Sequence, residues 1–330
     1  MKIFKIIVLL FFIGATGFFT GCKSDSGSEI VETPVEKVPI PRFERDSAYA
    51  FIEKQVAFGP RALNTEAHQA CADWMAEQLE SYGFKVIRQN FKAKVYTGET
   101  YDATNIIGQY NPDRKKRVLL AAHWDSRHLA DSPLSQERTD EPILGADDGG
   151  SGVGVLLEVA RQLQANPIEM GVDIIFFDAE DYGEEQNANS WGLGSQYWSR
   201  NVHVSGYDPK YGILLDMVGS KNARFAREQY SVRFAPQIVD KVWKLAQSMG
   251  YTNYFVDASA GGITDDHYFV NTIARIPMID IINRPASSQT GFGEYWHTHD
   301  DDMDIIDKRT LRAVGQVVLA VVYREANGDF

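Results

Sequence analysis

The sequence predicts an α/β fold, a three-layer α/β/α sandwich in which helices cover both faces of a mostly parallel central sheet. Two observations lead to this fold class. Apolar runs of four to six residues, bounded by polar turns, are typical of strands that are buried on both faces. These runs alternate along the chain with longer segments of helical periodicity, which favours a parallel sheet with helices on either side.

Helical periodicity predicts helices over about residues 46–57, 65–82, 151–165, 236–249 and 309–326. Gly83 and Gly250 follow the second and fourth of these segments, and glycine readily adopts the left-handed conformation that ends a helix. The apolar runs that predict strands are 118–122, 172–177, 212–215 and 277–282. Cys71 lies on the apolar face of the second predicted helix, so we expect it in the core.

Residues 1–21 are predicted to be a signal peptide of the lipoprotein type. Lys2 and Lys5 precede an apolar stretch, Ile6–Phe19, that is shorter than the ~20 residues of a membrane-spanning helix. The tetrapeptide that ends at Cys22, Phe-Thr-Gly-Cys, resembles the lipobox of bacterial lipoproteins, in which the cysteine is acylated. We therefore expect an exported protein that lipidated Cys22 anchors to the cell envelope, on its periplasmic or surface side. The alternative is an ordinary secretory signal whose cleavage site lies near a cysteine.

The remaining sequence separates into a tether and one domain. Residues 22–41 are rich in Ser, Glu, Pro, Val and Lys without a sustained period, which predicts a flexible tether. Residues 42–330 contain no second linker, repeat or charge block, so we expect them to form a single domain. With 33 Lys and Arg against 45 Asp and Glu, the formal net charge of −12 argues against nucleic acid as a partner. We expect a monomer.

Ionisable residues follow the predicted strands at the point where each strand ends. They are His123 after 118–122, Glu180 and Asp181 after 172–177, Asp216 after 212–215, and His297 after the last run. In an open α/β sheet, ligands bind at the carboxyl ends of the strands, where residues distant in sequence meet. Carboxylates and histidines gathered at that edge predict a metal site.

Segment 145–152, Gly-Ala-Asp-Asp-Gly-Gly-Ser-Gly, is an acidic turn at the start of a predicted helix. Its glycines permit a tight turn, but no Lys-Ser/Thr pair follows them, which argues against a phosphate loop. An acidic turn suits a cation, and Asp148 is the candidate ligand. The alternative is that Asp148 caps the following helix.

Five motifs together resemble those of the M28 family of zinc aminopeptidases: HWD at 123–125, GADDGGSG at 145–152, AED at 179–181, LLDMVG at 214–219 and WHTHDD at 296–301. More closely, they resemble its glutaminyl-peptide cyclotransferase branch, the glutaminyl cyclases. The similarity runs from about Phe58 to the C-terminus. It implies a single zinc-hydrolase-like domain that converts the N-terminal glutamine of peptides or proteins to pyroglutamate and releases ammonia.

The resemblance also implies one zinc ion, held by Asp148, Asp181 and His297, with an open fourth position for substrate. The family usually has Glu where this chain has Asp181, which keeps the charge and shortens the side chain by one methylene. Two alternatives stay open: Asp181 as a turn residue, and His299 as the ligand in place of His297.

The same resemblance assigns Glu180 as the general acid/base, which takes a proton from the substrate's α-amine and delivers it to the departing nitrogen. Asp216 and Asp265 match acidic residues that hold the leaving amide nitrogen, with Asp266 as the alternative to Asp265. The residues expected to line the substrate pocket are Trp191, Ile282, Phe292 and Trp296. In the animal enzymes a histidine matches Asp280, so this chain departs from the pattern there.

Two other functions compete with this interpretation. In a two-zinc aminopeptidase on the same scaffold, His123 and Asp216 would bind a second metal ion and Asp148 would bridge the two. Glu180 would then activate a water molecule. The features that favour a cyclase instead are Trp191, Trp296 and the segment 265–267. A non-catalytic binding module would have no need of the general acid/base, yet Glu180 is present.

Overall fold

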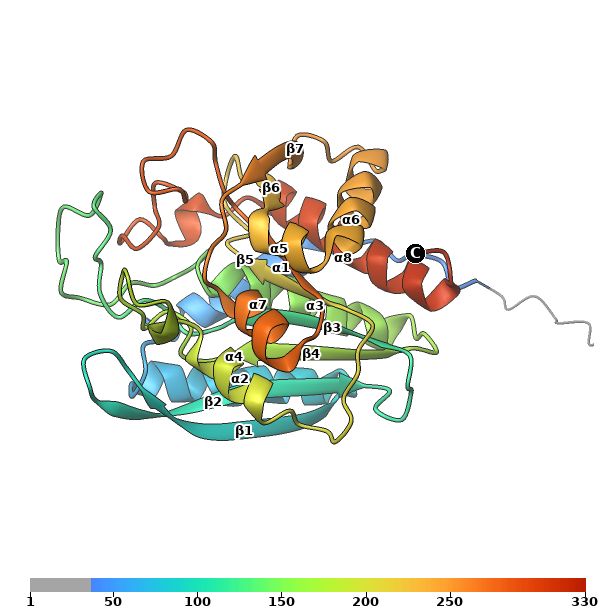
Figure 1. The fold of residues 1–330 in the computed structure, drawn as a ribbon, viewed down its shortest axis with the longest axis horizontal. Coiled ribbons are helices and arrows are strands. Elements are labelled where there is room, and N and C mark those ends of the chain that lie inside the picture. Colours follow the sequence, from blue (N-terminus) through green and yellow to red (C-terminus); the bar gives the residue numbers. More distant parts are fainter. Residues whose placement is uncertain (1–36) are drawn as a thin grey trace, which may run out of the picture. The chain divides into compact units, whose positions relative to one another are not determined.

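The computed structural model describes residues 37–330, which are built around one six-stranded sheet (Figure 1). Its strands are β1 (Lys85–Lys94), β2 (Thr100–Tyr110), β3 (Arg117–His123), β4 (Gly171–Phe177), β5 (Gly212–Asp216) and β8 (Met278–Ile282). The order across the sheet is β1-β2-β4-β3-β5-β8. β4, β3, β5 and β8 run parallel, so the four predicted strands and the mostly parallel sheet are confirmed.

Helices cover both faces of this sheet, which confirms the three-layer sandwich. They are α1 (Arg45–Val56), α2 (Glu66–Ser81), α3 (Gly150–Ala165), α4 (Leu193–Arg200), α5 (Gln229–Phe234), α6 (Pro236–Ser248), α7 (Asp266–Phe269) and α8 (Lys308–Asn327). α2, α3 and α8 lie over one face, with α1 against α3 and α8, whereas α4 and α7 lie over the other. The five predicted helices are present, and Gly83 (φ 80°) and Gly250 (φ 87°) take the expected left-handed conformation.

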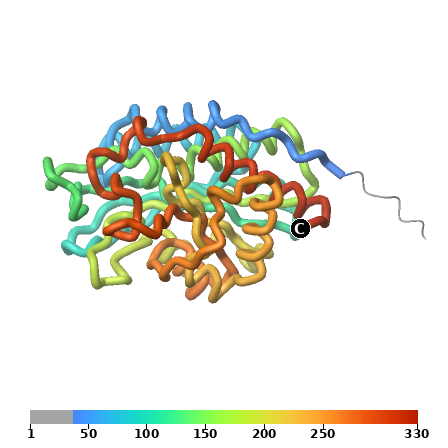
Figure 2. Tube along the Cα trace, turned by 90° about the horizontal axis from the view of Figure 1, so that it is seen from above, coloured from blue at the N-terminus to red at the C-terminus, as the bar shows by residue number. Residues whose placement is uncertain are grey.

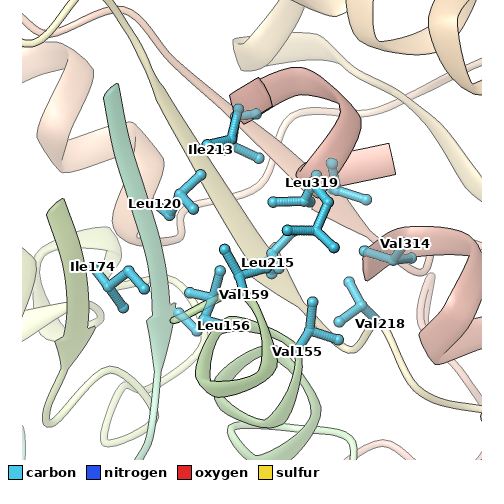
Figure 3. Close-up of a cluster of buried hydrophobic side chains, with 14 of the residues drawn as sticks. Leu120, Val155, Leu156, Val159, Ile174, Ile213, Leu215, Val218, Val314 and Leu319 are labelled. Atoms are coloured by element: carbon cyan, nitrogen blue, oxygen red, sulfur yellow. The ribbon is translucent and has the colours of Figure 1, made fainter. Parts of the chain in front are cut away.

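The parallel strands are buried on both faces because their side chains alternate between two hydrophobic cores. Leu120 and Ile174 point into the larger core, together with residues of α3 and α8 (Figure 3). Their neighbours Leu119 and Ile175 point into the smaller core, against Trp198 of α4. Cys71 is fully buried in the larger core, as its place on the apolar face of α2 predicts.

The antiparallel hairpin of β1 and β2 was not predicted from the sequence. Ten residue pairs join these two strands, and β2 continues the sheet antiparallel to β4. β1 is the edge strand, and most of its side chains are exposed or half-buried. It therefore carries alternating polar residues instead of a continuous apolar run, which is why it went unrecognised. A small parallel sheet of β6 (Phe225–Glu228) and β7 (Phe255–Ala260) was also not predicted.

The first residues of the described chain lie against the end of α8, as Figure 2 shows. Lys37 forms an ion pair with Asp329 at 2.7 Å, and the Val38 N–H donates to Asn327 at 3.0 Å. The last five residues of the range predicted as a tether, 37–41, are therefore packed on the domain, which begins earlier than residue 42. The predicted signal peptide, Cys22 and the rest of the tether lie outside the described residues. Among the helices of residues 37–330, none has the length and apolarity needed to cross a bilayer.

Candidate functional site

The ionisable residues predicted to meet at the carboxyl edge of the sheet do meet there. His123 and Asp216 are the last residues of β3 and β5, and Glu180 and Asp181 lie in the loop after β4. Asp148 lies in the turn before α3, and His297 comes from the loop that precedes α8. All six side chains are at least nine-tenths buried, so their charges depend on one another rather than on water.

Asp148, Asp181 and His297 form one group that could hold a metal ion. One ligand atom of each lies within 4.8 Å of the others, and His297 Nε2 is 3.1 Å from Asp181 Oδ1. Both carboxylate oxygens of Asp181 are buried and have no hydrogen-bond partner, and burial raises the pKa of this carboxyl. Two carboxylates and an imidazole fit zinc, and three protein ligands leave a position open for substrate.

The geometry distinguishes between the alternative roles expected for Asp148 and His299. The N-cap of α3 is Gly149, and no side chain caps this helix, so Asp148 is not its cap. His299 Nε2 lies 3.1 Å from the Arg138 carbonyl oxygen, away from the group. His297 is therefore the histidine that the fold brings to the two aspartates.

His297 is oriented by Asp131, which was not predicted as a site residue. Its Nδ1 lies 3.1 Å from Asp131 Oδ1, which leaves Nε2 directed at Asp181. Partial burial opposes ionisation of Asp131, but hydrogen bonds from His297 and Arg127 outweigh it and hold its pKa below the usual range. Carboxylates that hold a ligating histidine in this way commonly fix both its tautomer and its ring orientation.

Two buried carboxylates hold the loops that carry the acidic residues. Asp125 accepts hydrogen bonds from the backbone N–H groups of Glu180 at 3.0 Å and Asp181 at 3.1 Å. Asp301 accepts in the same way from Asp147 at 2.7 Å and from Asp148 at 3.0 Å. Both carboxylates lie inside recognised motifs, HWD and WHTHDD, so their positions were available in the sequence although their roles were not assigned.

Three residues beside the site have a left-handed backbone, which is uncommon outside glycine. They are Ala179 (φ 55°), Met217 (φ 47°) and His297 (φ 54°). Each lies next to a strand-end acid or is itself a candidate ligand. Such a conformation costs of order 1 kcal/mol or more and persists only where surrounding contacts fix it. Here the hydrogen bonds to Asp125 and Asp131 supply two of those contacts.

A second group that could hold an ion shares Asp148 with the first. His123 Nε2 lies 3.0 Å from Asp148 Oδ1 and 3.2 Å from Asp216 Oδ1. These three residues also offer ligand atoms within 4.8 Å of one another. The ligand geometry of a two-metal site is thus present, with Asp148 at the bridging position.

Glu180 and its acidic neighbours are buried deeply enough to favour their protonated forms. Burial raises the pKa of Glu180 well above its usual value, and the nearby Asp265 raises it further. Burial also raises the pKa of Asp216, to about 8, despite a hydrogen bond with His123. A buried carboxyl with a raised pKa can bind and release a proton in the course of a reaction, which is what general acid/base catalysis requires.

A cavity of about 460 Å³ opens beside the first metal-binding group. Every residue predicted for catalysis or for the substrate pocket contributes to its wall: Glu180, Asp216, Asp265, Trp191, Ile282, Phe292 and Trp296. Of the pair considered above, Asp265 lines the cavity and Asp266 does not. Trp296 stacks on His297 with 3.7 Å between ring centroids, so an aromatic wall adjoins the metal ligands.

Asp280 has a histidine beside it that comes from another part of the chain. Asp280 is fully buried in β8, and neither of its carboxylate oxygens has a hydrogen-bond partner. His267 lies between it and Glu228, with Nδ1 3.8 Å from Asp280 Oδ2 and Nε2 3.1 Å from Glu228 Oε2. This chain has Asp280 where a histidine is expected from the animal enzymes, and the imidazole of His267 lies beside Asp280 instead.

Residues 105–322 match the sequence family "Peptidase family M28", and the chain belongs to this family. Solved structures give a narrower comparison. The glutaminyl cyclase of Bacteroides thetaiotaomicron bound to N-acetylhistamine is 51% identical, with a TM-score of 0.84 over 86% of this chain and 99% of that one. The Tannerella forsythia glutaminyl cyclase is 52% identical, with a TM-score of 0.83 over 86% and 99%. The Drosophila melanogaster glutaminyl-peptide cyclotransferase is 24% identical over 78% of this chain and 75% of that protein.

Replacing Asp131 with alanine should weaken zinc binding about 10- to 100-fold, because His297 loses the carboxylate that orients its ring. Competition with a chromogenic chelator measures the affinity. Asp140→Ala, which removes an exposed acid from the same loop, is the matched control and should bind zinc like the unaltered protein. Equal zinc affinity in the two variants would mean that Asp131 does not position His297.

Proposed function

We propose that this chain is a zinc-dependent glutaminyl-peptide cyclotransferase, which converts the N-terminal glutamine of peptides and proteins to pyroglutamate with release of ammonia. One observation carries the proposal. Glu180, a buried carboxyl with a raised pKa, lines the same aromatic-walled cavity as the group Asp148, Asp181 and His297. The 51% and 52% identity to bacterial glutaminyl cyclases over 86% of the chain supports the same function.

In this proposal Asp148, Asp181 and His297 hold one zinc ion. Zinc in that position would polarise the γ-carbonyl of the glutamine side chain and stabilise the negative charge that develops on its oxygen. Asp131 keeps the His297 ring in place, and Asp125 and Asp301 keep the two ligand-bearing loops in place. The ligands are thus fixed before substrate binds, which reduces reorganisation during the reaction.

Glu180 carries the proton between the two nitrogens of the substrate. The α-amine attacks the γ-amide carbon, a new C–N bond closes the five-membered ring, and the bond to the amide nitrogen breaks. Glu180 takes the proton that the amine loses and gives it to the departing nitrogen, which leaves as ammonia. Proton transfer by a positioned side chain typically contributes 10² to 10⁴ in rate.

Asp216 and Asp265 line the cavity beside Glu180, where they can accept hydrogen bonds from the leaving amide nitrogen. Ile282, Phe292 and Trp296 enclose the glutamine side chain on its apolar side. Enclosure holds the amine against the amide, because the two reacting groups belong to one molecule and need only the folded geometry. It also excludes water, which would otherwise hydrolyse the amide.

The rival function, a two-zinc aminopeptidase, is supported by the geometry of His123, Asp148 and Asp216. In both candidate groups a histidine lies close to the carboxylates: His123 Nε2 is within 3.2 Å of Asp148 and Asp216, and His297 Nε2 is 3.1 Å from Asp181. The cyclase is favoured instead by the 51% and 52% identity to bacterial glutaminyl cyclases.

The purified protein should release ammonia from a glutamine-initiated dipeptide and should contain one zinc ion per chain. Enzyme-coupled ammonia detection and atomic absorption measure the two quantities, and a chelator should abolish the ammonia signal. Two zinc ions together with a freed amino acid, and no ammonia, would establish the aminopeptidase instead.

Glu180→Gln should reduce ammonia release by at least about 10²-fold and leave zinc bound, since the amide cannot carry the proton and Glu180 is not one of the proposed ligands. Asp148→Ala and His297→Ala should instead lose the metal. Zinc content and turnover are measured on all three variants. Full activity of Glu180→Gln would remove it from the mechanism, and unchanged zinc in both other variants would refute the proposed ligand set.

We also propose that the protein is exported and anchored to the cell envelope through lipidated Cys22. The lysines, apolar stretch and Phe-Thr-Gly-Cys sequence of residues 1–22 support this proposal. Full-length protein should partition into the detergent phase of a Triton X-114 extract, and Cys22→Ser should move it to the aqueous phase. Aqueous partitioning of both forms would contradict lipidation.

A further inference from the structure

A second cavity, of about 380 Å³, is lined by residues of two chain segments that also contribute to the wall of the first. In segment 258–265, residues 258–261 line the second cavity and residues 263–265 line the first. In segment 284–292, Ser288 and Gly291 line the second cavity, whereas Gln289, Thr290 and Phe292 line the first. Both cavities therefore lie beside the same two segments, although no residue lines both.

The floor of this second cavity comes from the small β6–β7 sheet. Val256, Ala258, Ser259 and Ala260 of β7 line it, together with Ala226 of β6. These side chains are mostly small, so the floor leaves room for a ligand. Within residues 37–330, β7 pairs with β6 alone, so its other edge retains free backbone groups that an extended peptide could pair with.

The second cavity is positively charged, although the chain as a whole carries a formal net charge of −12. Two arginines, Arg224 and Arg284, line it, and no acidic residue does. Neither arginine forms an ion pair with any residue of the described chain, 37–330. Asp257, the acid within β7, is paired with Arg227 and is not part of the wall.

Arg284 forms no direct ion pair among the described residues. Its Nη1 is buried without a hydrogen-bond partner, and burial lowers the pKa of the guanidinium despite the more distant charges of Asp280, Glu228 and Asp216. Its main contact is with Phe292, whose ring centroid lies 4.6 Å from the guanidinium carbon. A guanidinium offers pairs of parallel N–H donors in a fixed plane, which suit a carboxylate, and Nε with Nη2 is the pair that does not include the buried Nη1.

Arg284 is also close enough to the proposed reaction centre to meet the same peptide. From His297, successive contacts of 3.7 Å to Trp296, 4.8 Å to Phe292 and 4.6 Å to Arg284 connect the two places. At ~3.3 Å per extended residue, Arg284 lies within roughly four residues of the His297 ring. One of the three residues that follow an N-terminal glutamine can therefore reach it.

We propose that this second cavity is a substrate subsite that binds a carboxylate carried by one of the three residues after the N-terminal glutamine. The carboxylate belongs either to an Asp or Glu side chain or to the C-terminus of a short peptide. The inference rests on the proposed function, because that function places glutamine in the first cavity. It adds a preference for acidic peptides, with Arg284 as the residue that recognises them.

The test compares C-terminally amidated tetrapeptides that begin with glutamine and differ at one position. Glu is placed at position 2, 3 or 4, and the matched peptide has the isosteric Gln there. The ratio of kcat/KM for ammonia release, Glu over Gln, should be about three- to tenfold at one position, as for a partly desolvated ion pair. The ratio should fall as the salt concentration rises. The Glu and Gln peptides should differ in KM and share the same kcat.

Arg284→Gln should bring this ratio to about one, and Arg284→Lys, which keeps the charge, should retain part of it. The control is Arg114→Gln, which removes one positive charge from an exposed pair with Glu169 and should leave the ratio unchanged. Peptides with a free C-terminus, compared with their amides, show whether a terminal carboxylate is bound at the same place. A ratio that survives in Arg284→Gln would overturn the assignment to Arg284.

The possible results distinguish failure of the subsite proposal from failure of the proposed function. Ammonia release with a ratio of one at all three positions would refute the subsite and leave the function standing. Absence of ammonia from every peptide would refute the function, and peptide affinity would then be measured directly by tryptophan fluorescence. Tighter binding of the Glu peptides that depends on Arg284 would still support the subsite, and equal binding would refute it.

Discussion

The dominant constraint on this structure is the negative charge buried at the carboxyl edge of its sheet. Glu180, Asp181, Asp216, Asp265 and Asp280 are all buried there, and burial raises the pKa of each. So many ionised carboxylates cannot remain together in a low-dielectric interior without compensation. Histidines, shared protons and a bound cation are the available means. The chemistry proposed for the site uses the same three means, so stability and function draw on one set of contacts.

The rigidity of the site comes from carboxylates that do not themselves face the cavity. Asp125 and Asp301 each bind two consecutive backbone N–H groups, and each thereby fixes one acid-bearing loop. Asp131 and Arg127 do the same for His297 and for the loop after β4. These contacts help Ala179 and His297 to keep left-handed backbone angles that would otherwise be unfavourable. Several residues of the motifs HWD and WHTHDD therefore position other side chains and take no part in the proposed chemistry.

The sequence was sufficient for the central fold because parallel strands and their helices have strong, simple patterns. Val118–Ala122 is a continuous apolar run, Val172–Phe177 is interrupted only by Asp173, and both lie in buried strands. The edge strand β1 has no such run, since only one of its faces is covered, and it was missed. The candidate site was predictable to the level of which residues meet, because strand ends converge. The supporting contacts of Asp131, Arg127 and His267 were not, because they depend on long-range geometry that no local pattern records.

The direction of α8 determines where the described chain begins relative to the cavity. This helix begins shortly after His297 and Asp301, at the edge that carries the cavity, and its 20 residues extend about 30 Å away from it. Lys37 is bound at its far end, through Asp329. The described chain thus begins at the end of α8 remote from the cavity. Residue 37 and the cavity are separated by the length of this helix, so changes at the start of the described chain do not touch the cavity wall.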